Sequence, residues 1–284
     1  MKNKQATYFS WLLKTPLYLW TLVFVCATLL YIIGISFFER GEVIGVGDTL
    51  TISNYQRWLE PQYAKVFLES LKLASITTLL CIGFGYPFGY FLARLSPTAK
   101  TIVLMLVIVP FWTNALIRMY GWRILLLANG PINQLLLDLS IIQKPLKLLY
   151  TDMSVLLGMV YALLPFMILP VYTTVEKLDV SIVNASRDLG ASPFYAFCSV
   201  TVPLTLPGLM AGCVLVFIPS MGLFFISDLL GGSKSVLAGG LIRNMINNRD
   251  LPLAAALSVI LLCMTTVIIF FYRKWGGKDE VISL

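Results

Sequence analysis

The chain has 284 residues, of which 58% are hydrophobic and only 12% are charged, and its formal net charge is +7. An apolar content that high, gathered into runs of about twenty residues, excludes a soluble domain and indicates an integral membrane protein. The positive charge is typical of Lys and Arg that flank spans beside anionic lipid, so we expect a lipid bilayer, and no nucleic acid, as its partner.

The sequence has few of the residue types that commonly serve in catalysis or metal binding. Histidine, the commonest general base and metal ligand, is absent. The five cysteines show no paired spacing, which predicts neither a disulfide framework nor a metal site. We therefore expect this chain to contain no catalytic residue, no metal and no cofactor.

Runs free of Asp, Glu, Lys and Arg predict an all-α membrane fold with six transmembrane helices in a single domain, residues 1–284. The predicted spans are 15–38, 73–93, 101–117, 153–175, about 205–227 and 251–272. A shorter apolar run, 124–137, is interrupted by Asn129-Gly130-Pro131, which predicts a turn and a short helix at the outer surface.

The N-terminal segment carries Lys2, Lys4 and Lys14 before the first span. The apolar run that follows is too long for a signal peptide and has no small-residue cleavage site, so we expect it to remain as an anchor. An even number of spans puts both termini on one side of the membrane. Lys and Arg are divided almost evenly between the two sides, so they do not identify that side.

The connector between the fourth and fifth spans, residues 181–203, predicts a helix, an elbow and a second helix. Four of its residues recur at the spacing of one helix face: Ile182, Ala185, Ser186 and Leu189. Gly190 would end this first helix, because glycine adopts the left-handed conformation without a side-chain clash.

The second helix of the connector is predicted to begin at Ser192-Pro193, with a serine cap and a proline in the first helical position. Its face continues through Phe194, Phe197, Cys198 and Thr201. We expect Pro203 to end it.

The spacing of the connector resembles the coupling loop of permease subunits in bacterial ATP-binding-cassette (ABC) importers. That family has Glu-Ala-Ala, three residues, Gly, nine residues and then Ile-x-Leu-Pro. Here Asn184-Ala185-Ser186 occupies the triplet, Gly190 and Pro203 lie at the matching offsets, and Val200 and Val202 replace the Ile and Leu. Because Asn184 replaces the glutamate, we do not expect the salt bridge to the ATPase that a glutamate would make.

This resemblance implies the type I importer permease fold, with the connector as a cytoplasmic helix-turn-helix and both termini in the cytoplasm. The residues it implies for contact with the ATPase are Asn184, Ala185, Ser186, Asp188, Gly190 and Pro203. The alternative is an amphipathic connector that has no partner.

Two further stretches resemble the first permease subunit of spermidine/putrescine importers. One runs from Val109-Pro110-Phe111-Trp112 to Met119-Tyr120, and the other is residues 219–232, beginning Pro219-Ser220-Met221-Gly222. The similarity covers about 54–272. Opine, phosphonate and ferric-iron permeases share part of it, so these solutes are the alternative cargoes.

The resemblance implies a bacterial cytoplasmic (inner) membrane location, multi-pass, and three kinds of protein partner. These are a second homologous permease, a dimer of ATPase subunits and an extracytoplasmic substrate-binding protein. The chain has no phosphate-binding loop of its own, since Gly277-Lys278 is followed by Asp279 and lacks the preceding glycine. ATP hydrolysis is therefore expected in the separate ATPase subunits, and the chain is expected to be a transport subunit and not an enzyme.

A polyamine path would use a few carboxylates together with aromatic faces that attract ammonium groups. Asp228 is the first candidate, because it ends an apolar run and follows Phe224 and Phe225. The alternatives are that Asp228 caps the fifth span or pairs with Lys234. Secondary candidates are Trp112, Tyr120, Tyr161 and Tyr86, although Trp112 also fits an interfacial anchor.

Other charged residues fit a cation path less well. Arg118 and Arg123 argue against a simple cation funnel, and Asp250 is expected to meet Arg249 or Arg243 in a structural role. An intramembrane enzyme or a stand-alone channel would need paired acids or a repeated pore motif, which we do not find. The expected function is ATP-driven import of a polyamine into the cytoplasm.

Overall fold

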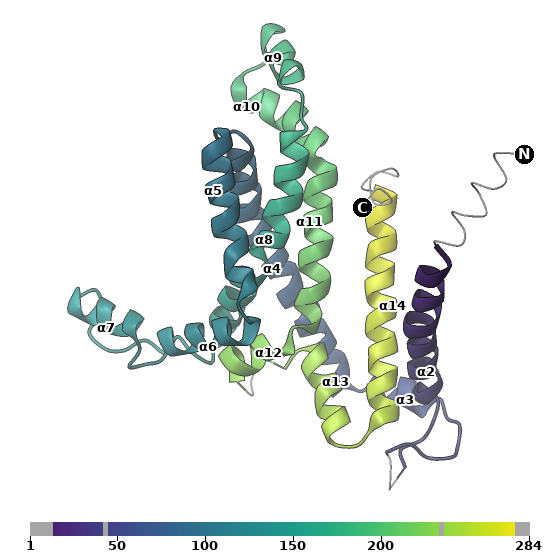
Figure 1. Cartoon of the computed structure of the whole chain (residues 1–284). Helices are drawn as coiled ribbons and strands as arrows, with labels where there is room; N and C mark the ends of the chain where they lie inside the picture. The colour runs from purple at the N-terminus through teal and green to yellow at the C-terminus, as the bar shows by residue number, and fades with distance from the viewer. Residues whose placement is uncertain (1–13, 42–44, 233–235, 276–284) are drawn as a thin grey trace, which may run out of the picture. The chain divides into compact units, whose positions relative to one another are not determined.

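The structure is a computed structural model that describes residues 14–41, 45–232 and 236–275. Lys2, Lys4, Lys234 and the Gly277-Lys278 pair lie outside these described residues. Within them the regular structure is helical, and an isolated bridge joins Phe38 to Leu50. Figure 1 shows the helices in chain order.

Five helical stretches of the described chain are long and apolar enough to cross a membrane. The first is Lys14–Ser36, which includes η1 (Thr21–Cys26) and α2 (Ala27–Ser36). The second and third are α4 (Pro61–Ala93) and α8 (Asp152–Glu176). The fourth is Pro193–Gly222, which ends in α11 (Val202–Gly222), and the fifth is Leu251–Tyr272 within α14 (Leu251–Trp275). A bent pair is the sixth candidate: α5 (Pro97–Ile108) continues as η2 (Val109–Trp112), and α6 (Ala115–Leu125) follows at 95°. The predicted all-α membrane fold is confirmed.

Short helices connect these long ones. They are α3 (Ser53–Arg57), α7 (Pro131–Asp138), α9 (Val180–Asp188), α10 (Pro193–Ala196), η3 (Phe197–Thr201), α12 (Phe224–Ile226), η4 (Ser227–Gly231) and α13 (Ala238–Asn247). The apolar run 124–137 contains the end of α6, a turn and α7, so the predicted turn and short helix are present.

Two of the predicted spans are not continuous helices. The run 101–117 is divided after Trp112, because the side chain of Asn114 caps a new helix by accepting the backbone N–H of Leu116 at 2.8 Å. The run 205–227 is divided after Gly222, because Leu223 leaves the helical range with ψ 62°. Apolar content alone does not show these breaks, since both lie inside apolar sequence.

The chain divides into two compact units, which we describe separately. Unit 1 comprises Met1–Ala64 and Leu241–Met264, and unit 2 comprises Lys65–Gly240 and Thr265–Leu284. A single domain over 1–284 stays a prediction.

In unit 1, Asp250 begins α14 and pairs with Arg57, not with Arg249 or Arg243 as expected. Its Oδ1 accepts the backbone N–H of Leu253 at 3.3 Å, and its Oδ2 lies 3.1 Å from Arg57 Nη1. The carboxylate is 4% exposed, so both oxygens need partners inside the unit. The structural role predicted for Asp250 fits this cap and ion pair.

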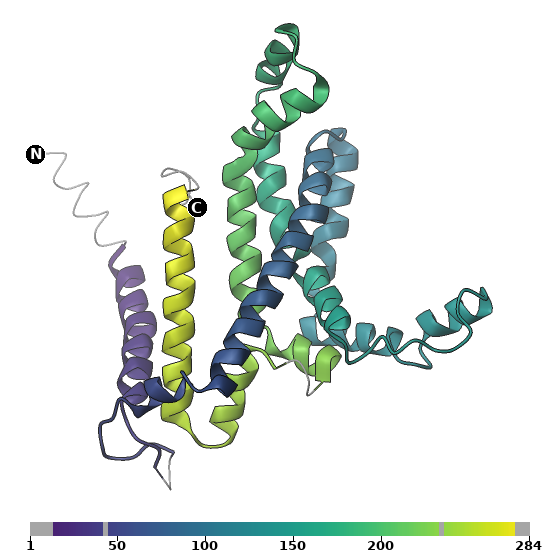
Figure 2. The ribbon, with the colours of Figure 1, turned by 180° about the vertical axis from the view of Figure 1, so that it is seen from behind.

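In unit 2, α8 and α11 pack side by side, as Figures 1 and 2 show from opposite directions. Glycines on α11 allow the close approach. A Cβ added to Gly208 would lie 2.6 Å from the carbonyl oxygen of Pro170, and one added to Gly212 would lie 2.7 Å from the sulfur of Met167. Small residues at such contacts are typical of helix packing in membranes.

Gly208→Ala is expected to lower the stability of the chain by about 1–3 kcal/mol, because the added methyl group forces α11 away from the backbone of α8. The midpoint of thermal unfolding in detergent measures this loss. Gly83→Ala is the matched control, since a Cβ at Gly83 meets no heavy atom within 4 Å. Equal midpoints for the two variants would contradict the close contact between α8 and α11.

Candidate functional site

The connector begins with α9, which is capped at both ends by local hydrogen bonds. The carboxylate of Asp179 accepts the backbone N–H of Ser181 at 2.8 Å. This backbone bond is the main cause that holds the pKa of Asp179 below its ordinary value, and a hydrogen bond from the Ser181 side chain is the second. Because the folded-state pKa is depressed, the cap is fully present at neutral pH and is lost only as pH falls through that low pKa.

Gly190 ends α9 with φ +92°, as predicted. The backbone N–H of Gly190 bonds to the carbonyl of Arg187 at 2.9 Å, and that of Ala191 bonds to the carbonyl of Ser186 at 3.1 Å. These two bonds form a Schellman motif, the common helix ending for a residue with positive φ. The elbow is therefore fixed by the backbone itself.

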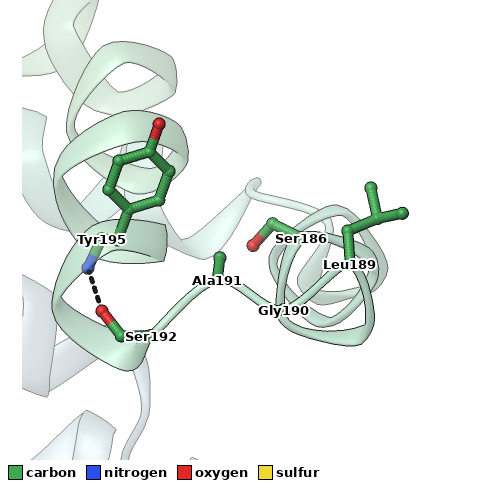
Figure 3. A pocket seen from close by; sticks show the side chains of 6 residues that line it. All are labelled: Ser186, Leu189, Gly190, Ala191, Ser192 and Tyr195. Carbon is green, nitrogen blue, oxygen red and sulfur yellow. Dashed lines mark hydrogen bonds between the residues drawn. The ribbon is translucent and has the colours of Figure 1, made fainter.

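The second helix begins at Ser192-Pro193, also as predicted. The Oγ of Ser192 accepts the backbone N–H of Tyr195 at 3.2 Å, and Pro193 occupies the first turn. Figure 3 shows this cap in the elbow. The elbow also forms a hollow of ≈ 570 Å³. The residues that line the hollow are Ser186, Leu189, Gly190, Ala191, Ser192 and Tyr195.

The connector exposes large apolar side chains. Leu189 is 91% exposed, Phe194 77% and Tyr195 64%, and α9 buries none of its residues. Of the predicted contact residues, Asn184, Ala185, Asp188 and Gly190 are exposed and Ser186 is half-buried. The backbone of this elbow is fixed, and its apolar side chains are left exposed by the rest of the chain. These are the properties of a docking surface.

The prediction that Pro203 ends the second helix is wrong. α10, η3 and α11 form one continuous helical stretch, Pro193–Gly222. The backbone N–H of Val202 bonds to the carbonyl of Phe197, five residues back. This π-helical turn interrupts the ordinary pattern just before Pro203, where proline has no N–H to donate, so the chain stays helical. The second helix of the connector is thus the start of the fifth span.

Asp228 lies in η4, a π-helical turn that is separate from α11. Since α11 ends at Gly222, Asp228 does not cap the fifth span, and this alternative is wrong. The pairing with Lys234 concerns a residue outside the described chain. Asp228 is half-buried, and η4 is attached to the start of α8, where Ser154 Oγ donates to the carbonyl of Leu230 at 2.8 Å.

Three of the predicted path residues lie around one part of unit 2. Tyr161 and Phe225 border the apolar cluster that contains Ile226 and Leu230, on either side of Asp228 in the chain. Phe224 meets Phe225 edge to face, with ring centroids 6.4 Å apart and an interplanar angle of 84°. Discontinuous helices form the substrate sites of many transporters.

The other predicted path residues lie elsewhere. Trp112 is 82% exposed and Tyr120 is 49% exposed, so both face outward from this chain. Tyr86 is buried between α4 and α11, where its hydroxyl lies 2.8 Å from Thr205 Oγ1 and its ring meets Phe197. This arrangement joins Tyr86 to the connector side of the helix pair.

Sequence reasoning missed the contacts that assemble the path region. Arg118 and Trp122 on α6 lie beside Tyr161 of α8, with the Trp122 and Tyr161 rings 5.5 Å apart. No spacing in the sequence predicts these contacts, since α6 and α8 are separated by the α7 region. Within the described residues there is also no group of three or more Cys, Asp or Glu that could hold a metal ion.

α8 links the two candidate regions. The connector follows its C-terminal end, and η4 is attached at its N-terminal end (Figure 1). A helix of 25 residues is about 37 Å long. The exposed apolar surface of the connector and the break that carries Asp228 are therefore at opposite ends of one helix.

Comparisons with known proteins identify the family of this chain. The family described as "binding-protein-dependent transport system inner membrane component" matches residues 85–274. The spermidine/putrescine transport system permease protein PotB of Escherichia coli K12 is 45% identical over 267 residues, covering 93% of this chain and 97% of that protein. PotB of Haemophilus influenzae is 41% identical over 256 residues, covering 90% of each chain.

The fold is also shared with a solved structure. A chain of the bacterial alginate ABC transporter, crystallised with a periplasmic protein bound to an alginate pentasaccharide, has a TM-score of 0.75. The match covers 99% of this chain and 98% of that one at 13% identity, so it shows the type I permease fold alone. The chain therefore belongs to the binding-protein-dependent transport system inner membrane component family and is a membrane-spanning permease subunit of an ABC importer, in which separate subunits hydrolyse ATP.

Proposed function

We propose that this chain carries polyamines, spermidine or putrescine, into the cytoplasm as the permease subunit of an ATP-driven importer. The observation that carries the proposal is the 45% identity to the Escherichia coli protein PotB, whose name gives those two cargoes, over 93% of this chain. The family match over residues 85–274 includes Asp228 and its neighbours.

The chemistry of the path region supports a cationic cargo. A polyamine is a flexible chain with several ammonium groups separated by aliphatic carbons. Asp228 offers one carboxylate at the helix break, and the rings of Phe225 and Tyr161 border the same region. Aromatic faces attract ammonium groups without binding them tightly, which suits a site that must release its cargo.

The exposed elbow of the connector is the proposed contact with an ATPase subunit. Leu189, Phe194 and Tyr195 provide its apolar surface, with Asn184, Ala185, Ser186 and Asp188 beside them on α9. The other proposed partners are a second ATPase subunit, a homologous permease and an extracytoplasmic substrate-binding protein. The alginate transporter crystallised with its periplasmic protein supports the last of these. This assignment puts the connector and both termini on the cytoplasmic side of a bacterial inner membrane.

The experiment is deletion of this gene in its own bacterium, with uptake of radiolabelled spermidine and putrescine as the measurement. We expect ATP-dependent uptake of both polyamines to be lost and to return with the wild-type gene on a plasmid. Uptake of a labelled opine, a phosphonate and chelated ferric iron is followed in the same cells. Normal polyamine uptake with loss of one of these other solutes would contradict the proposal.

A further inference from the structure

Arg118 lies on the first turn of α6, just after the 95° bend that follows η2. Its guanidinium carbon is 4.4 Å from the centroid of the Phe111 ring and 5.8 Å from that of the Tyr161 ring. We call these two rings the aromatic cage. Tyr161 is close to the midpoint of α8, so the cage is well inside the length of a spanning helix.

Two further rings hold the cage in place. Phe166 meets the Phe111 ring edge-on, with centroids 5.8 Å apart and an interplanar angle of 88°. Trp122 meets the Tyr161 ring at 5.5 Å and 68°. The elements η2, α6 and α8 therefore all contribute to one site whose faces are aromatic.

The guanidinium of Arg118 is held there by ring faces and not by an acid. Its Nε and Nη1 are buried and have no hydrogen-bond partner among the described residues, and no ion pair of Arg118 is found in that part of the chain. An ionisable residue at membrane depth almost always pairs with an opposite charge or faces a cavity, and by default it marks a functional site. The guanidinium of Arg118 therefore contacts aromatic rings as a bound cation would. It lacks the hydrogen bonds that would hold it tightly between these rings.

We propose that Arg118 is a tethered occupant of a cation-binding site: its guanidinium fills the aromatic cage when the path is empty, and an ammonium group of the cargo takes its place during transport. The inference rests on the proposed function, because it requires a cationic cargo. The same ring faces that attract a guanidinium also attract an alkylammonium group.

Electrostatic repulsion explains why an incoming ammonium group displaces the guanidinium of Arg118 from the cage. Two unit positive charges cannot share a cage of this size away from bulk water without strong repulsion. Arg118 must therefore leave as an ammonium group enters, and its return helps to expel the cargo. The site then binds cargo weakly enough to release it. This explains why an arginine lies beside a path for cations.

The test is equilibrium binding of radiolabelled spermidine to the purified importer in nanodiscs, without the binding protein. Arg118→Met removes the competing charge and keeps an unbranched chain, so we expect it to bind spermidine about threefold to tenfold more tightly than the wild type. Arg118→Gln should act in the same direction and serves if the methionine variant assembles poorly. Arg118→Lys keeps a competing cation and should stay close to the wild type.

Arg123→Met is the matched control. Arg123 lies on the same helix but donates to the Tyr150 hydroxyl at 3.2 Å, outside the cage, so its loss should leave spermidine binding unchanged. Phe111→Leu removes one face of the cage and should weaken binding. Neutral variants of Arg118 that assemble normally and bind spermidine no more tightly than the wild type would overturn the inference.

Uptake by the same wild-type complex, supplied with loaded binding protein in proteoliposomes, separates the two proposals. If spermidine is transported but the Arg118 variants bind it no more tightly, only the tethered-cation inference fails. If the wild-type complex transports no polyamine, the proposed function fails and this inference fails with it.

Discussion

Replacing Gly190 with valine is expected to abolish ATP-driven uptake while the chain still inserts and accumulates normally. Gly190 has φ +92°, a conformation that costs a side-chain-bearing residue about 1–2 kcal/mol and a β-branched one more. A Cβ at Gly190 would meet no heavy atom within 4 Å, so the effect comes from backbone strain and not from crowding. The strain changes the angle between α9 and α10 and disperses the docking surface.

The measurements for Gly190→Val are uptake in membrane vesicles and ATPase activity stimulated by the loaded binding protein. Gly83→Val is the control, because Gly83 is exposed on α4 with equally open space and no positive φ. Gly190→Asn should retain part of the activity, since asparagine tolerates positive φ better than valine. Full uptake by Gly190→Val would exclude the elbow from ATPase coupling.

Local features of the connector could be predicted from the sequence because short-range interactions fix them. Gly190 and Ser192-Pro193 determine a helix end and a helix start within a few residues, and both predictions are confirmed. Pro203 was misread because its effect depends on the π-helical turn before it. A proline ends a helix only where the missing donor is needed, and the sequence does not show the hydrogen-bond register.

The six-span pattern could be predicted from the apolar runs in the sequence. The breaks within two of these spans could not. The bend after Trp112 and the break after Gly222 lie inside apolar sequence, and both shape the path region. Contacts between residues far apart in the chain could not be predicted from the sequence either. Asp250 pairs with Arg57, which is distant in sequence, and not with the adjacent Arg249, while its other oxygen caps α14.

Contacts between η2, α5 and α8 connect the proposed ATPase contact with the aromatic cage. At the connector end of α8, Glu176 Oε1 lies 2.7 Å from Lys100 Nζ on α5, which joins the two helices. Further along, the ring of Phe111 in η2 meets Phe166 of α8 edge-on. We expect a movement of α9 to shift α8 and α5 together and so to change the cage, because packed helices move as units rather than deforming continuously.

The second large effect is expected at the other end of α8. Asp228→Asn should lower spermidine uptake about 10-fold to 100-fold, because a hydrogen bond to a charged group contributes about 1.5–3 kcal/mol and each 1.4 kcal/mol is tenfold. Asp228→Glu keeps the charge and should recover much of the activity. Asp138→Asn is the control, since Asp138 is an exposed acid at the end of α7.

Uptake is measured at equal membrane abundance, with thermal unfolding in detergent to separate a folding defect from a transport defect. Asparagine nearly preserves the shape of aspartate, so a transport role predicts lost uptake at an unchanged unfolding midpoint. A lowered midpoint with uptake per folded molecule intact would make Asp228 a structural residue. Uptake of spermidine within twofold of the wild type would remove Asp228 from the path.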